Sequence, residues 1–111
     1  MSGFGGLGLG SLLKQVQQVQ ENIKNVVQEL RDTDFEGEAG GGAVRVKMDG
    51  HKRLKEVKIE PSAVDPAEVE TLEDLVLAAV NNATEAADKA KMEKMQGATG
   101  GLPIPPELLG L

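Results

Sequence analysis

The stretch FEGEAGGGAVRVKMDGHKRLKEVKIEP (residues 35–61) decides the fold, because two parts of it alternate between apolar and polar side chains. Residues 44–48 read Val-Arg-Val-Lys-Met, which is typical of a strand with one buried and one polar face. Asp49-Gly50 is a turn signal and alternation resumes over residues 54–60, so these segments predict a hairpin. An earlier strand over residues 35–39, turned back by the glycines that follow it, completes a three-stranded antiparallel meander.

An amphipathic helix is predicted over residues 11–31, with Ser11 as its N-cap. Its apolar residues alternate between spacings of four and three residues, the pattern of a helix seam or a short coiled coil, and they are Leu12, Val16, Val19, Ile23, Val26 and Leu30. Most side chains between them are polar, so the helix needs a partner along one stripe only. That partner is either the chain's own sheet or another subunit, and the two interpretations are compatible.

A second helix is predicted over residues 71–95, after a short turn at residues 65–68 that has an acidic cap followed by proline. Its inner face is rich in alanine, which lets another backbone approach closely, and consists of Leu72, Leu75, Val76, Ala79, Val80, Ala83, Ala86, Ala87 and Ala90. The order helix, three strands, helix predicts an α+β fold. We expect one domain over residues 11–96, a flexible Gly-rich tail at 1–10 and a Gly/Pro/Leu-rich tail at 97–111.

The composition excludes several classes of function. The chain has 111 residues with no Cys, no Trp, no Tyr and two Phe, so it can form no disulfide and no thiolate metal site. It also has no aromatic platforms on which single-stranded nucleic acid would stack. The first ten residues do not resemble a signal peptide, and no apolar run is long enough to span a membrane. These features predict a cytoplasmic protein without membrane association.

Catalytic chemistry is not expected either. His51 is the only histidine, has one nearby carboxylate in Asp49, and cannot supply the three or four convergent ligands of a metal site. The sequence contains no phosphate-binding loop motif, no zinc-protease motif and no nucleophile elbow. We therefore predict a non-enzymatic protein without a metal or cofactor.

Charge is distributed unevenly along the chain. The net charge is −6, yet residues 45–58 hold six basic residues against two acidic ones, which is +4 and leaves −10 for the remainder. In the predicted sheet, Val57 and Ile59 point inward, while Arg45, Lys47 and Lys58 line the exposed face.

Four further lysines would gather at one tip if the two helices run antiparallel, and they are Lys14, Lys89, Lys91 and Lys94. Phosphate contact would follow from such clusters. The alternative is that these are ordinary solubilising charges.

Five blocks of sequence carry a family likeness, and they are SLLKQVQQVQENIKNVVQEL, FEGEAGGGAVRVKMDG, LKEVKIEPSAVD, LEDLVLAAVNNATEAADK and GATGGLPIPPELLGL. In this order they resemble segments of the YbaB/EbfC family over nearly the whole chain. The resemblance implies a homodimer with a central β region and helices projecting as two arms that bind duplex DNA. It also implies a nucleoid-associated protein without catalytic activity, often encoded beside replication and recombination genes, whose proteins are possible partners.

From the charges and the resemblance together we expect double-stranded DNA as the ligand, a nucleoid location, and a role in chromosome organisation or gene regulation. The expected DNA-binding residues are Lys14, Lys24, Arg31, Arg45, Lys47, Lys55, Lys58, Lys89, Lys91 and Lys94. The acidic net charge favours the alternative of a protein-interaction adapter whose DNA contact is incidental.

Overall fold

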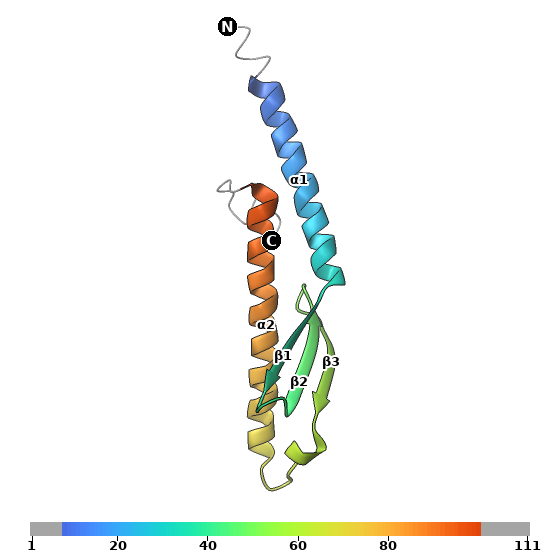
Figure 1. Cartoon of the computed structure of the whole chain (residues 1–111), viewed down its shortest axis with the longest axis vertical. Helices are drawn as coiled ribbons and strands as arrows, with labels where there is room; N and C mark the ends of the chain where they lie inside the picture. The colour runs from blue at the N-terminus through green and yellow to red at the C-terminus, as the bar shows by residue number, and fades with distance from the viewer. Residues whose placement is uncertain (1–7, 101–111) are drawn as a thin grey trace. The chain divides into compact units, whose positions relative to one another are not determined.

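The computed structural model describes residues 8–100, and it confirms the predicted α+β fold (Figure 1). Along the chain, the elements follow the order α1, β1, β2, β3, a short 3-10 turn η2, and α2, and the three strands form an antiparallel sheet. The chain divides into two compact units. The first, which we call the helical unit, comprises the described residues up to Gln28 and from Glu93 onward, and the second, the sheet unit, is Glu29–Met92.

The sheet has the strand order β1-β2-β3. Its strands are β1 (Asp34–Ala39), β2 (Val44–Asp49) and β3 (Leu54–Ile59), which match the predicted meander closely. Gly40, Gly41 and Gly42 all have positive φ angles, which explains the glycine run in the tight β1–β2 turn. The β2–β3 pairing contains one register shift, between Lys47 and Met48.

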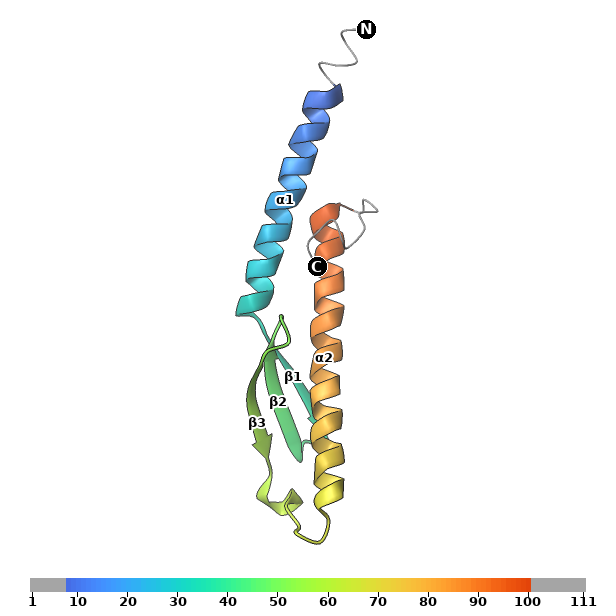
Figure 2. The same cartoon turned by 180° about the vertical axis from the view of Figure 1, so that it is seen from behind.

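Helix α2 (Val69–Thr99) runs along one face of the sheet, as Figure 1 and the view from behind in Figure 2 show. The core of the sheet unit lies between this face and α2. The buried side chains Val44, Val46 and Met48 of β2 pack against alanines of α2, which are Ala79, Ala83 and Ala87. The alanines recur every four residues, so they form one small-residue stripe. That stripe allows the helix to lie close to the strands, as the sequence predicted.

Helix and sheet approach each other closely at Gly37 of β1. A Cβ placed on Gly37 would lie 2.9 Å from Ala83 Cα, and it would be closer still to the Ala79 carbonyl oxygen and the Ala83 nitrogen. Carbon atoms in good contact are about 3.5–4.0 Å apart. Position 37 therefore has room for glycine and for no larger residue.

One helix does not cover the whole face of the sheet. Leu54, Val57 and Ile59 of β3 are 45%, 44% and 38% exposed. They are the cross-strand partners of Met48, Val46 and Val44, which are almost fully buried. Directly paired residues point to the same side of a sheet. Val57 and Ile59 thus face the same side as the core, as predicted, but α2 leaves them uncovered.

The chain enters α2 through a capped turn. The backbone N–H of Ala67 donates to Asp65 Oδ1 at 3.0 Å, and the N–H of Glu68 donates to the Asp65 carbonyl at 2.8 Å. Asp65 thus caps the turn that was predicted before the helix, and α2 then begins at Val69 rather than at residue 71. The 3-10 turn η2 (Pro61–Ala63) lies between β3 and this cap.

The helical unit consists of most of α1 (Leu9–Asp32) and the last turns of α2. Val26, Met95 and Ala98 are its buried apolar residues, and Asn22 Nδ2 donates to the Ala98 carbonyl at 3.2 Å. The prediction of Ser11 as the N-cap is wrong, because α1 already begins at Leu9. Helix α2 also continues past residue 95 and ends at Thr99, followed by Gly100 with a φ of 64°.

Candidate nucleic-acid interface

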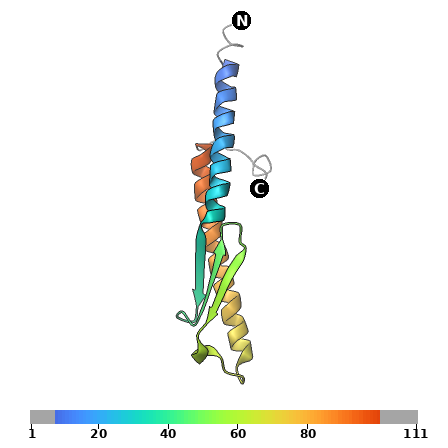
Figure 3. The same ribbon diagram turned by 90° about the vertical axis from the view of Figure 1, so that its right-hand side faces the viewer.

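Basic side chains on the outer face of the sheet are already neutralised by carboxylates. Figure 3 views the sheet from the side away from α2. Arg45 Nε lies 3.7 Å from Glu38 Oε2, and Glu56 is within 3.7 Å of Lys47 and 3.3 Å of Lys58. Such exposed pairs contribute little to stability. They do, however, place a negative charge beside each cation, which weakens its attraction for a phosphate.

Lys55, at the edge of the sheet, is paired most tightly. Its Nζ donates to Asp34 Oδ1 at 2.7 Å, and this hydrogen bond raises the pKa of the Lys55 ammonium above its usual value. The four sheet residues expected to bind DNA, Arg45, Lys47, Lys55 and Lys58, therefore all have carboxylate partners.

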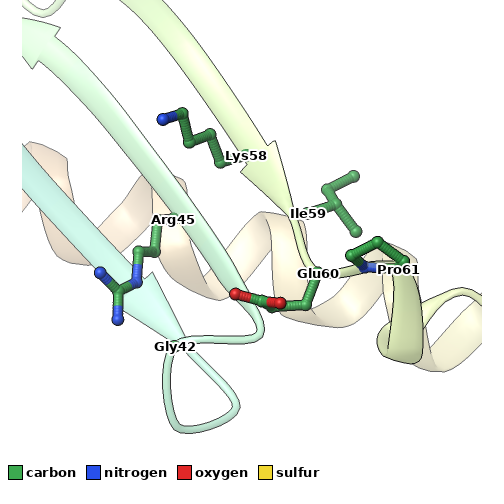
Figure 4. Close-up of a pocket in the computed structure, with 6 residues that line it drawn as sticks. All are labelled: Gly42, Arg45, Lys58, Ile59, Glu60 and Pro61. Carbon is green, nitrogen blue, oxygen red and sulfur yellow. The ribbon is translucent and has the colours of Figure 1, made fainter.

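A shallow pocket opens at the end of strands β2 and β3 (Figure 4). It has a volume of about 510 Å³ and is lined by Gly42, Arg45, Lys58, Ile59, Glu60 and Pro61. This lining contains no histidine, hydroxyl or thiol. The pocket is a surface feature of the charged sheet face.

The β2–β3 turn is held against two neighbouring elements of the sheet unit. Gly50 N–H donates to the Leu30 carbonyl at 2.8 Å, and Lys52 Nζ lies 2.7 Å from Asp88 Oδ1. These contacts bring the turn next to the end of α1 and to α2. In the sequence, Leu30, Lys52 and Asp88 are each followed by an exposed cation. We call these three cations the turn cluster, and they are Arg31, Arg53 and Lys89.

The turn cluster differs from the sheet face in its ion pairing. Among residues 8–100, Arg31, Arg53 and Lys89 have no carboxylate partner. Arg31 and Lys89 were expected DNA-binding residues, whereas Arg53 was not. The sequence placed Arg53 in the basic stretch, but only the folded turn brings it near the end of α1 and near α2.

Asp49 stabilises the turn that carries Arg53. Its Oδ1 accepts from the backbone N–H of His51 at 2.8 Å and from that of Arg53 at 3.0 Å. The bond from Arg53, followed by that from His51, holds the pKa of the Asp49 carboxyl below its usual value of 3.8. Asp49 thus stabilises a turn in which Lys52 adopts a φ of 66°, which is uncommon for a residue other than glycine.

The helical unit carries Lys14, Lys24 and Lys94, three more of the expected residues. Since Asn22 lies level with Ala98, helical rise puts Lys14 about 12 Å from that level in one direction and Lys94 about 6 Å in the other. The structure therefore does not bring Lys14 and Lys94 together. Lys24 and Lys94 differ by only about 3 Å along the helix axes. Lys91 shares a side of α2 with Lys94, three residues later.

Within residues 8–100 there is no group of three or more metal-ligating side chains that could hold an ion. No helix in this part of the chain has the length and apolar character needed to cross a membrane.

Comparisons with known proteins agree on one family. A model of the YbaB/EbfC DNA-binding family matches residues 5–102. The chain is 45% identical over 101 residues to a nucleoid-associated protein of Clostridium novyi, covering 91% of this chain and 89% of that protein. It is 46% identical over 104 residues to one of Acetivibrio thermocellus, covering 91% of both.

A solved structure gives independent support for the fold. An uncharacterized protein from Helicobacter pylori superposes with a TM-score of 0.62 at 22% identity, covering 77% of this chain and 86% of that one. The family match and the relatives establish the assignment. The chain belongs to the YbaB/EbfC DNA-binding family of nucleoid-associated proteins, which is a non-enzymatic family.

Proposed function

We propose that this protein binds duplex DNA as a homodimer through cations of its helices and its β2–β3 turn, and that it organises the chromosome or regulates genes. The observation that carries this proposal is the contrast in ion pairing. The sheet cations have carboxylates within 4 Å, whereas Arg31, Arg53 and Lys89 of the turn cluster are exposed without such partners. Phosphates are therefore attracted more strongly to the turn cluster than to the sheet face.

Further cations on the helices are proposed as additional phosphate contacts. Lys14, Lys24, Lys91 and Lys94 are the remaining helical residues expected from the sequence. Arg45, Lys47, Lys55 and Lys58 become secondary contacts, because a phosphate would compete with Glu38, Glu56 and Asp34 for them.

Binding is expected to be of modest affinity and strongly dependent on salt. Lysine and arginine contacts to phosphates release counterions and fix position without reading bases. The net charge of −6 opposes the approach of DNA to all surfaces except the basic ones. We therefore expect weak sequence preference.

The homodimer is supported by the uncovered apolar face of β3. Leu54, Val57 and Ile59 continue the core layer beyond α2, and β3 is also an edge strand. Half-exposed side chains of this size each contribute roughly 1 kcal/mol when a second subunit covers them. A second copy of the chain offers the same apolar face, as the symmetry of a two-fold dimer requires.

The test of DNA binding compares two sets of neutralising substitutions. Fluorescence anisotropy of a labelled duplex is measured over a range of salt concentrations for the wild type, for Arg31→Gln/Arg53→Gln/Lys89→Gln, and for a control, Arg45→Gln/Lys47→Gln/Lys58→Gln. Each lost phosphate contact lowers the slope of log K against log salt by about 0.9. We expect the turn-cluster variant to lose affinity and slope, and the control, which removes only secondary contacts, to lose much less of both. Equal losses in the two variants would contradict the assignment of the turn cluster.

The same titration distinguishes a DNA-binding protein from the alternative, a protein-interaction adapter. An adapter that docks a protein through apolar contacts would show little salt-dependent DNA affinity. No binding of the wild type even at low salt would therefore favour the adapter. The dimer is tested by light scattering, which should give twice the 11.7 kDa of one chain for the wild type and a lower mass for Val57→Asp/Ile59→Asp.

A further inference from the structure

The first half of α1 presents an apolar stripe that no residue of the described chain covers. Leu9, Leu12, Leu13 and Val16 are 57%, 55%, 55% and 47% exposed. Their spacing places them on one side of the helix. Burial on α1 begins only at Val19 and is complete at Val26, where the end of α2 packs.

The stripe stays bare because α2 ends too early to reach it. Asn22 is bonded to Ala98, and α2 stops one residue later at Thr99. Residues 9–18 of α1 therefore have no packing partner among residues 8–100. A helical segment of about ten residues is marginal in water by itself, so an apolar partner would stabilise it.

The side chains around the stripe suit contact with the same stripe on a second copy of the chain. Among residues 9–18 the only charged side chain is Lys14, which the helical period places on the opposite side from Leu12 and Val16. The neighbouring side chains are uncharged, with Gln15 on the flank. Two copies can thus meet without like-charge repulsion. This face offers no cation to the phosphates of DNA, and it has no surrounding charges that would complement those of a charged protein partner.

The repeat of the apolar residues points to the same occupant. From Leu9 the spacings run three, four, three and four through Leu12, Val16, Val19 and Ile23, which is the seam of a two-stranded coiled coil. Leu13 adds one more apolar side chain beside this seam, near the N-terminal end of α1. A second copy presents the same seam.

We propose that the stripe formed by Leu9, Leu12, Leu13 and Val16 is a self-association surface through which DNA-bound dimers join one another. Four half-exposed side chains per copy offer roughly 500 Å² in total, taking about 120 Å² for a fully buried leucine side chain. Stable interfaces bury about 1,200 Å² or more. The contact is therefore weak in dilute solution and becomes populated when neighbouring dimers on one DNA raise the effective concentration.

The role of DNA in this proposal rests on the proposed function, but the self-association can be measured without DNA. Sedimentation velocity over rising protein concentration compares the full-length wild type with Leu12→Gln/Val16→Gln and with Ser11→Ala/Gln18→Ala, a control on the opposite side of α1. We expect the mean mass of the wild type and the control to rise above that of the dimer, while Leu12→Gln/Val16→Gln stays at the dimer mass. A wild-type mass that does not rise, or a rise equal in all three proteins, would overturn the proposal.

A second measurement adds DNA. On a duplex long enough for several dimers, the stripe variant should bind with a shallower, less cooperative isotherm than the wild type. On a short duplex that holds one dimer, the two should bind equally. If the short duplex is not bound at all, the proposed DNA function fails while the mass measurement still decides the self-association. If a chain lacking residues 101–111 associates more strongly than the full chain, that segment occupies the stripe and the proposal is wrong.

Discussion

The substitution Gly37→Ala tests the close packing that joins β1 to α2. The new methyl group would lie 2.9 Å from Ala83 Cα and closer to two backbone atoms of α2. All three of these atoms belong to the main chain of α2, so no flexible side chain can move aside. The strand and the helix must therefore separate.

The magnitude follows from the contact distances. Reaching a normal carbon separation of about 3.5–4.0 Å requires a displacement of roughly 0.6–1.1 Å. A gap of this size removes about a quarter to a half of each dispersion contact along the interface. Overpacking costs about 1–3 kcal/mol and occasionally more, and we expect the upper end, about 3 kcal/mol, because the Ala79, Ala83 and Ala87 stripe moves as one rigid helix. That is a large part of a typical domain stability of about 5–15 kcal/mol.

Urea denaturation followed by far-ultraviolet circular dichroism measures this change, since the chain has no Trp or Tyr to report by fluorescence. Protein concentration is held constant because dimerisation couples to stability. The matched control is Gly97→Ala in α2, where an added Cβ meets nothing within 4 Å. There alanine should raise stability by about 0.5–1 kcal/mol through helix propensity. If Gly37→Ala unfolds at the same urea concentration as the wild type, the close approach of β1 and α2 is refuted.

Two further predictions concern a turn and a helix end. Asp49→Ala should lower the denaturation midpoint at pH 7, because the carboxylate accepts two backbone N–H groups. The pKa of Asp49 is lowered in the folded protein, so its contribution is present above the unfolded value of 3.8 and is lost as the pH falls through the folded value. The difference in denaturation midpoint between Asp49→Ala and the wild type should therefore vanish in acid. A difference in midpoint that is independent of pH would contradict this reasoning. Asn22→Ala removes the bond to Ala98, a loss of about 1 kcal/mol that helix propensity offsets by about half. Amide exchange in the last turn of α2 should become faster, and unchanged exchange would show that the bond does not hold the two helices together.

Much of the fold could be predicted because periodicity reports which residues share a face. The alternation over residues 44–48 located β2, and the alanine spacing located the side of α2 that packs on it. Helix ends were less certain. Ser11 has the right side chain for a cap, yet α1 begins at Leu9, since a capping residue is optional when the preceding residues can continue the helix.

The candidate site was harder to foresee, because charge on a sequence does not reveal charge pairing. Arg45 and Glu38 face each other across β1 and β2, and Lys47 faces Glu56 across β2 and β3. These pairs depend on the register of the sheet, which includes a shift after Lys47. The sequence therefore identified a basic stretch but not that its sheet residues are neutralised.

The sequence alone determined the types of the secondary-structure elements, their order and the family, because each of these depends on local pattern or composition. Tertiary structure decided three things that depend on distance between separate elements. It showed that β3 extends beyond the cover of α2, that the first half of α1 extends beyond the end of α2, and that Arg53 lies in a turn held against α1 and α2. Periodicity states which side of an element is apolar, but only the width and length of the neighbouring element decide how much of that side is buried.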